Sequence, residues 1–227
     1  MKLRTLVALA GLLASPVLAA EPNTLTDAEK AAGWRLLFDG QNPGVSFRNY
    51  KQPAISDGWA AENGALVWKR KGAGDIITKE QFENFEFSVE WKISEGGNSG
   101  VMFRVQETGG APWNTGPEAQ IQDNVKGHDP QKAGWLYQFY QATTDATKPV
   151  GEWNHFRLVV NHNKCEHWMN GVKYFEYEIG SDDWNERYAK SKFSKFPDFA
   201  RIAKGHLCLQ DHGNEVAFRN IKIRVLP

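Results

Sequence analysis

This chain of 227 residues has few cysteines and no excess of charge of either sign. Its two cysteines, Cys165 and Cys208, form no Cys-x-x-Cys pair, so a structural zinc site is not predicted. A disulfide between them is allowed in an oxidising compartment, and two buried thiols agree equally well with the sequence. Lys and Arg together number 27, as do Asp and Glu, which argues against nucleic acid or an anionic membrane as a partner.

Long apolar runs are also missing, and the one short run lies near the start of the chain. Residues 6–13 are apolar but too few to span a bilayer, and Lys2 and Arg4 precede them. Small residues follow at 17–20, so we predict a signal peptide over residues 1–20 and a periplasmic or extracellular location. Without this segment the chain has two more acidic than basic residues. Residues 21–227 are expected to form a single domain with its own core.

Motifs of several enzyme classes are absent. There is no Gly-x-Ser-x-Gly, no P-loop, no dinucleotide fingerprint and no His-Glu-x-x-His. The Glu-x-Asp-x-x-Glu pattern of laminarinase-like glycosidases is also missing, because Gln120 stands between Glu118 and Asp123. A glycosidase with the usual carboxylate pair is therefore not predicted. A site for a divalent metal, built from Glu118, Asp123, His128 or His212, remains possible. The spacing of these residues gives it no positive support.

Short segments with alternating apolar and polar residues fill most of the chain. Residues 84–93 alternate almost throughout, and Asn63-Gly64 joins two segments in a predicted type I′ hairpin. Strands are predicted over 34–38, 59–62, 65–68, 75–78, 84–93, 101–105, 118–123, 135–137, 153–160, 165–169, 172–177, 206–210 and 216–225. The phase of the last strand slips, which predicts a β-bulge near Asn220.

Helical signals are few. Thr26 and Glu29 form a capping box at the start of a short helix, and residues 182–199 break the strand pattern in a predicted helical insertion. Residues 41–58 are predicted to be a loop because Pro, Asn, Gly and Ser recur there. Many short strands and little helix together predict an all-β protein, an antiparallel β-sandwich.

Two predicted strands in the middle of the chain carry polar residues opposite the core. In residues 101–105 the odd-numbered positions are apolar, so Arg104 points the other way. In residues 118–123, Glu118, Gln120 and Gln122 share one face. These side chains can form a polar platform that hydrogen-bonds a sugar. A solvated outer face is an equally good explanation at this point.

Similar polar groups end the predicted strand at 206–210. Alternation puts Gln210 and His212 opposite the core, and a carboxylate with an imidazole nearby can do general acid–base chemistry. A plain turn is the alternative for Asp211-His212-Gly213. Lys192 and Asn98 are weaker candidates, because such residues are commonly a solvated lysine and a turn former.

Eight short motifs occur in one order across nearly the whole mature chain. They are Gly33-Trp34-x-x-Leu37-Phe38-Asp39-Gly40, Gly96-Gly97-Asn98-Ser99-Gly100-Val101-x-Phe103-Arg104, Glu118-x-Gln120-Ile121-x-Asp123, Pro149-x-Gly151-Glu152-Trp153-Asn154, His167-Trp168-Met169-Asn170-Gly171, Ser191-Lys192-Phe193, Gly205-x-Leu207-x-Leu209-Gln210-Asp211-His212-Gly213 and Phe218-Arg219-Asn220-Ile221-x-Ile223. With them the chain resembles the 3-keto-disaccharide hydrolase family, whose fold is a concanavalin A-like jelly-roll sandwich.

The resemblance implies cleavage of 3-keto-disaccharides or 3-keto-glucosides. A ketone at C3 acidifies the C2 proton, a base removes it, the C1 substituent leaves and water adds. Hydrolysis and elimination with later hydration both remain open. The implied catalytic residues are Glu118, Asp211 and His212. The implied substrate-binding residues are Asn98, Arg104, Gln120, Asp123, Trp153, Lys192 and Gln210. The alternative is a carbohydrate-binding module of the same fold without catalysis, which would need neither Glu118 nor His212.

Overall fold

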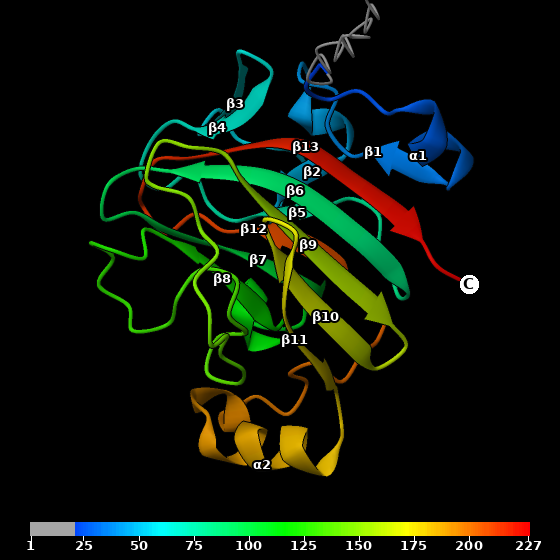
Figure 1. Cartoon of the computed structure of the whole chain (residues 1–227), viewed down its shortest axis with the longest axis vertical. Coiled ribbons are helices and arrows are strands. Elements are labelled where there is room, and N and C mark those ends of the chain that lie inside the picture. Colours follow the sequence, from blue (N-terminus) through cyan, green and yellow to red (C-terminus); the bar gives the residue numbers. More distant parts are fainter. Residues whose placement is uncertain (1–20) are drawn as a thin grey trace, which may run out of the picture.

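Two antiparallel β-sheets packed face to face form the body of the protein (Figure 1). The structure is a computed structural model and describes residues 21–227. The predicted signal peptide, residues 1–20, lies outside the described residues. The predicted all-β class is confirmed, and the arrangement is a concanavalin A-like jelly-roll sandwich with little helix.

The larger sheet has eight strands in the order β11-β10-β9-β6-β13-β4-β3, with β1 also paired to β13. Asn63 and Gly64 join β3 to β4 with φ values of 50° and 74°, as the predicted type I′ turn requires. The strands are β1 (Trp34–Leu36), β3 (Trp59–Glu62), β4 (Ala65–Trp68), β6 (Phe85–Ile93), β9 (Asn154–Asn161), β10 (Lys164–Met169), β11 (Val172–Glu178) and β13 (Val216–Val225).

The smaller sheet has five strands in the order β2-β5-β12-β7-β8. They are β2 (Phe47–Asn49), β5 (Ile76–Thr78), β12 (His206–Leu209), β7 (Asn98–Val105) and β8 (Glu118–Gln122). Val101, Ile121 and Leu209 point from this sheet into the core. Because neighbouring residues of a strand point to opposite faces, the residues between them lie on the outer face of the sheet.

The core lies between the two sheets and is rich in aromatic side chains. Phe87 and Trp91 of β6, Phe218 of β13 and Phe103 of β7 are each at most 1% exposed. Full burial of a large apolar side chain stabilises the fold by about 1.5–3 kcal/mol. The alternating strands therefore supply the main stabilising surface of the sandwich.

The helices lie at the periphery. In α1 (Asp27–Ala31) the predicted capping box is present, since the Glu29 carboxylate accepts a hydrogen bond from the Thr26 N–H at 2.9 Å. The predicted insertion contains α2 (Asp182–Lys190) and the 3-10 helix η3 (Lys192–Lys195), at the end of the molecule away from α1 (Figure 1). Two further 3-10 helices are η1 (Pro43–Val45) and η2 (Pro112–Asn114).

The register of paired strands shifts at three places in residues 21–227, one of them between β10 and β11 at His167 and Trp168. The predicted bulge at Asn220 is confirmed by a φ of 51° and a register shift against β6. A second bulge, which the sequence did not predict, lies at Arg104, whose φ is 56°. It turns Val105 to the outer side of the smaller sheet, where it packs with Met102 and Cys208. The prediction that all odd-numbered residues of 101–105 face the core is therefore wrong for Val105.

Two local predictions are wrong. Residues 41–58 contain β2, a strand of three residues that shows no alternation of its own and forms because β5 supplies hydrogen-bond partners. Residues 135–137 form no strand; Leu136 makes only isolated bridges to Ala119 and Tyr140 within a turn.

Cys165 and Cys208 are both buried, unbonded thiols. Within residues 21–227, helices are too short or too polar to cross a membrane.

Candidate active site

A polar hollow of about 220 Å³ lies on the outer face of the smaller sheet, where β7, β8 and β12 meet the surrounding loops. We call it the polar pocket. Its lining combines carboxyl groups, amides, one ammonium group, one imidazole and two aromatic rings. The lining residues are Asp75, Asn98, Trp113, Glu118, Gln120, Asp129, Tyr137, Lys192, Gln210, Asp211 and His212.

Strand alternation places the residues from the sheet itself. Ala119 and Ile121 of β8 face the core, so Glu118 and Gln120 point outward into the pocket. Gln210 directly follows β12 and is 8% exposed. Its Oε1 atom is buried and has no hydrogen-bond partner within residues 21–227, which leaves an acceptor available to a ligand hydroxyl.

Glu118 is held tightly against the neighbouring strand. Only 7% of the residue is exposed, and a Cβ atom placed on Gly100 of β7 would lie 2.4 Å from its Oε1 atom. Glycine at position 100 therefore makes room for this carboxyl group. When the Gln120 side-chain amide is turned so that its nitrogen faces these acceptors, it can donate to the Ser99 carbonyl at 3.0 Å and to Oε1 of Glu118 at 3.3 Å.

The surroundings of Glu118 favour its neutral form. Burial raises the pKa of Glu118 to about 8; the Lys192 ammonium group opposes this shift, while the Asp75 and Asp129 carboxyl groups add to it. A carboxyl group with this pKa is mostly protonated at neutral pH. Glu118 can then donate a hydrogen bond where an ordinary glutamate would only accept one.

A second acidic group, Asp75, stands at the edge of the pocket just before β5. Its Oδ1 atom accepts the Asp211 N–H at 2.9 Å, and its Oδ2 atom has no donor within residues 21–227. Burial raises the pKa of Asp75 to about 6, and the hydrogen bond from Asp211 partly opposes the shift. The pocket thus holds two carboxyl groups whose pKa values differ, the arrangement that separates an acid from a base.

Asp211 has a different position. One oxygen of its carboxylate accepts the Trp68 indole N–H at 2.7 Å, and the other accepts the Gly74 N–H at 2.7 Å. Both oxygens are therefore occupied by the protein. Asp211 orients the segment before β5, including Asp75, and its catalytic role stays a prediction.

Lys192, Tyr137 and Trp113 form the opposite wall. The Lys192 Nζ atom lies 4.3 Å from the Tyr137 ring centroid and 5.9 Å from that of Trp113. Tyr137 donates its hydroxyl hydrogen to Asp129 at 2.8 Å. Within residues 21–227 Lys192 forms no ion pair, so its charge is available to an anionic oxygen in the pocket. Trp113 is 36% exposed and offers a face on which a sugar ring can stack.

Seven of the ten predicted site residues line the polar pocket. His212 is exposed at its mouth, while Glu118, Gln120 and Gln210 are buried in its floor. The seven are Asn98, Glu118, Gln120, Lys192, Gln210, Asp211 and His212.

Arg104 does not line the polar pocket. The bulge at Arg104 reverses the expected direction of its side chain, which is 2% exposed. Its guanidinium donates to the carbonyl oxygens of Ala200 at 3.1 Å and His162 at 2.7 Å, and to the Asn163 side chain at 3.1 Å. Arg104 ties loops together and has a structural role.

Asp123 and Trp153 also lie outside the polar pocket. Asp123 follows the end of β8 and accepts the N–H groups of Gly96 and Val125, each at 2.9 Å, beside a separate hollow. The Trp153 ring is covered by the Arg219 guanidinium, 4.2 Å from its centroid, on the larger sheet. The structure does not bring these two residues to the polar pocket, and their substrate-binding role stays a prediction.

Four lining residues were missed by the sequence analysis. Asp75 is the first residue of the strand predicted over 75–78, and in the structure it directly precedes β5. Trp113, Asp129 and Tyr137 come from irregular segments whose path no periodic pattern describes. Only the fold brings them to β8 and β12.

The metal site left open by the sequence is not assembled. No group of three or more His, Cys, Asp or Glu side chains suited to a metal ion occurs in residues 21–227. Of the four possible ligands, Glu118 and His212 line the polar pocket, while Asp123 lines the separate hollow.

Comparison with known proteins agrees with this fold. Residues 33–224 match the family described as 3-keto-alpha-glucoside-1,2-lyase-like domain. The chain belongs to this family. The 3-keto-disaccharide hydrolase of Bacteroides thetaiotaomicron is 30% identical to the chain over 243 aligned residues, which cover 92% of the chain and 83% of the relative.

Solved structures show the same likeness. A crystal structure of a glycosyl hydrolase candidate from Parabacteroides distasonis is 36% identical, with a TM-score of 0.85, over 91% of this chain and 100% of the other. A second one from the same organism is 29% identical, with a TM-score of 0.66, over 85% of this chain and 99% of the other.

Proposed function

We propose that this protein hydrolyses 3-keto-glycosides by removing the proton at C2 of the keto sugar. The observation that carries the proposal is the pair of carboxyl groups, Asp75 and Glu118, held in one pocket with separated pKa values beside the unpaired Lys192. Family membership and the name of the B. thetaiotaomicron relative support the substrate class. Export to the periplasm or beyond, from the predicted signal peptide, is part of the same proposal.

In the first half of the reaction, Asp75 is the base. Between pH 6 and 8 it is mostly a carboxylate, and its free Oδ2 atom takes the C2 proton. The electron pair of the C2–H bond moves toward the C3 ketone and then expels the substituent at C1. The C1–O bond breaks, a C1=C2 double bond forms next to the ketone, and Asp75 passes its proton to the departing oxygen.

In the second half, water restores the sugar. Asp75, again a carboxylate, takes a proton from water as the oxygen of that water bonds to C1. The same proton then returns to C2. One C1–O bond is replaced by another, and the net change is hydrolysis with no oxidation or reduction.

Glu118 and Lys192 stabilise the enolate that forms within each half of the reaction. Negative charge develops on the C3 oxygen when the C2 proton leaves. A protonated carboxyl group and an ammonium group aimed at that oxygen, in a site shielded from water, lower the barrier by a few kcal/mol. The raised pKa of Glu118 keeps it in the donating form at the pH where Asp75 is ionised.

The test is turnover of the mature protein on a glucoside and on its 3-keto counterpart, with and without a chelator. We expect release of the leaving group from the keto sugar alone. In D₂O the product should carry deuterium at C2 above the level of an enzyme-free control. Release from neither sugar, with binding still detectable, would favour the carbohydrate-binding module, and release without deuterium would contradict the proposed chemistry.

Glu118→Gln should lower kcat at least about a hundredfold, the usual scale for an acid–base group. Glu83→Gln, at an exposed position outside the pocket, is the matched control. Because His212 is exposed at the mouth, we expect His212→Ala to have a smaller effect than Glu118→Gln. Full activity of Glu118→Gln would remove Glu118 from the catalytic set.

A further inference from the structure

A second hollow adjoins the polar pocket on the same outer face. Its volume is about 570 Å³, and the two hollows share Asp75. The 3-10 helix η2 also borders both, because Pro112 lines the second hollow and Trp113 lines the polar pocket. The two hollows are therefore adjacent parts of one groove.

The sizes of the two hollows suit a substrate with two parts. Pockets that enclose a drug-sized ligand measure about 300–1,000 Å³. The polar pocket, at about 220 Å³, falls below that range, so it has room for one sugar ring but not for a disaccharide. The second hollow alone is more than twice as large. Whatever is attached to C1 of the bound sugar needs such a space.

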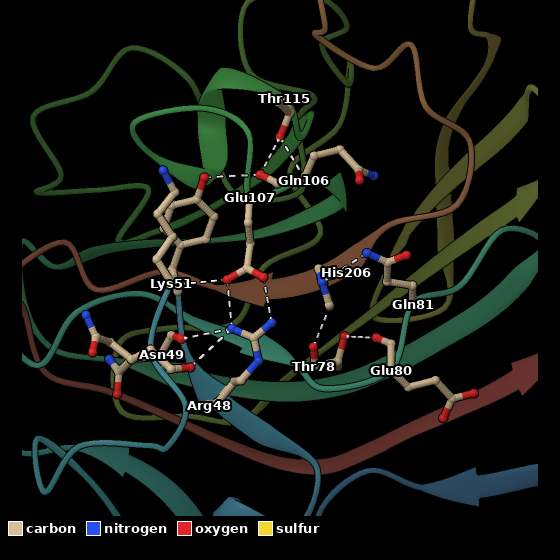
Figure 2. A network of polar contacts seen from close by, with 12 residues as sticks. Arg48, Asn49, Lys51, Thr78, Glu80, Gln81, Gln106, Glu107, Thr115 and His206 are labelled. Carbon is tan, nitrogen blue, oxygen red and sulfur yellow. Dashed lines mark hydrogen bonds and ion pairs between the residues drawn. The ribbon is translucent and has the colours of Figure 1, made fainter.

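The walls of the second hollow are mainly apolar, and Asp75 at the border is the one charged side chain among the described residues that line it. Tyr50, Pro53 and Ile55 face it. Arg48, which lies beyond Pro53, is paired with Glu107 through two hydrogen bonds of 2.7 Å each (Figure 2). Because this pair neutralises itself, the hollow suits an uncharged group with an apolar face, such as a second sugar ring or an aromatic ring.

Hydrogen bonds between the three segments that build the second hollow keep it open. Asn49 donates from its side chain to the Ala73 carbonyl at 2.7 Å, and the Ser56 hydroxyl donates to the same carbonyl at 2.8 Å. The Tyr50 hydroxyl lies 3.0 Å from the Gly109 carbonyl and joins a third segment. A preformed site of this kind binds without a further ordering cost.

We propose that the second hollow binds the leaving group of the substrate, an uncharged sugar or aromatic aglycone, while the keto sugar occupies the polar pocket. This inference rests on the proposed function. It also fits the place of Asp75 at the border, since the oxygen that joins the two parts of the substrate would lie beside the carboxyl group that protonates it.

The test fills the second hollow from its exposed rim. Ala54 lines the hollow and is exposed, so Ala54→Trp adds bulk without disturbing the core. The matched control is Val125→Trp, because Val125 is 89% exposed and lies beside the separate hollow. For each protein kcat/KM is measured on a 3-keto-disaccharide and on the methyl 3-keto-glucoside of the same anomeric configuration.

We expect Ala54→Trp to lower the ratio of the two kcat/KM values, disaccharide over methyl glucoside, at least tenfold relative to the wild type. Val125→Trp should leave the ratio within twofold. If Ala54→Trp also leaves the ratio within twofold, the second hollow does not bind the leaving group, even though the hydrolase assignment stands. If the wild type cleaves neither substrate, the proposed function itself fails, and the leaving-group site fails with it.

Discussion

Gly100 offers a test of the site that changes the position of a catalytic group and not its chemistry. A Cβ atom at this position would lie 2.4 Å from Oε1 of Glu118 and 3.0 Å from its Cγ and Cδ atoms. Ordinary contacts between heavy atoms are about 3.5 Å, so in Gly100→Ala the carboxyl group must move by about 1 Å. The atom that has to move is the end of a side chain, so the strand itself can stay in place.

The expected loss of activity follows from this displacement. A misplacement of about 1 Å can cost about a hundredfold in rate, which corresponds to about 2.7 kcal/mol of barrier. The stability should hardly change, because Gly→Ala at a compatible backbone position stabilises a protein by about 0.4–1 kcal/mol through the unfolded chain. No positive φ is recorded for Gly100, so alanine is compatible with its backbone.

The assay is release of the leaving group from a 3-keto-glycoside, together with thermal unfolding. Gly100→Ala should lower kcat/KM about a hundredfold while its Tm stays within a few degrees of the wild type. The double variant with Glu118→Gln should be no slower than Glu118→Gln alone, because both changes act on one group. Turnover of Gly100→Ala within twofold of the wild type would refute the placement of Glu118 in the reaction, and additive losses in the double variant would place its effect elsewhere.

Two further predictions concern pH and the role of Arg104. Because Asp75 acts as a carboxylate and Glu118 as an acid, kcat/KM should rise with pH through about 6 and fall through about 8. A pH–rate profile in which kcat/KM does not fall above pH 8 would contradict this assignment. The folded-state pKa of Glu118 lies above its ordinary value, so stability should also fall as pH rises toward 8, and Glu118→Gln should unfold at a higher temperature than the wild type at pH 8.5. Arg104→Met should lower the free energy of unfolding by about 2–4 kcal/mol, because it leaves buried carbonyl groups unpaired. The kcat of the folded fraction should stay within twofold of the wild type. A large loss of kcat at unchanged stability would instead indicate that Arg104 acts in the site.

Alternation along regular strands accounts for the part of the site that could be predicted. Glu118 and Gln120 lie in β8, which has no bulge, so counting by two places them correctly on the outer face. The same counting failed at Arg104, because one residue with a positive φ shifts the phase of β7 and sends the guanidinium toward Ala200. A bulge is stabilised by its surroundings in the fold, and no sequence pattern in residues 101–105 indicated this one.

The sequence by itself determined the sandwich, the positions of most strands, the capped helix α1 and the outward direction of Glu118 and Gln120. These features depend on short-range periodicity, turn residues and caps, which act within a few residues. The tertiary structure alone decided that Asp75 stands beside Glu118, that Asp211 is occupied by Trp68 and Gly74, and that a second hollow continues the pocket. Those relations join residues far apart in the chain, and burial, which sets the acidity of the two carboxyl groups, exists only once the sheets have packed.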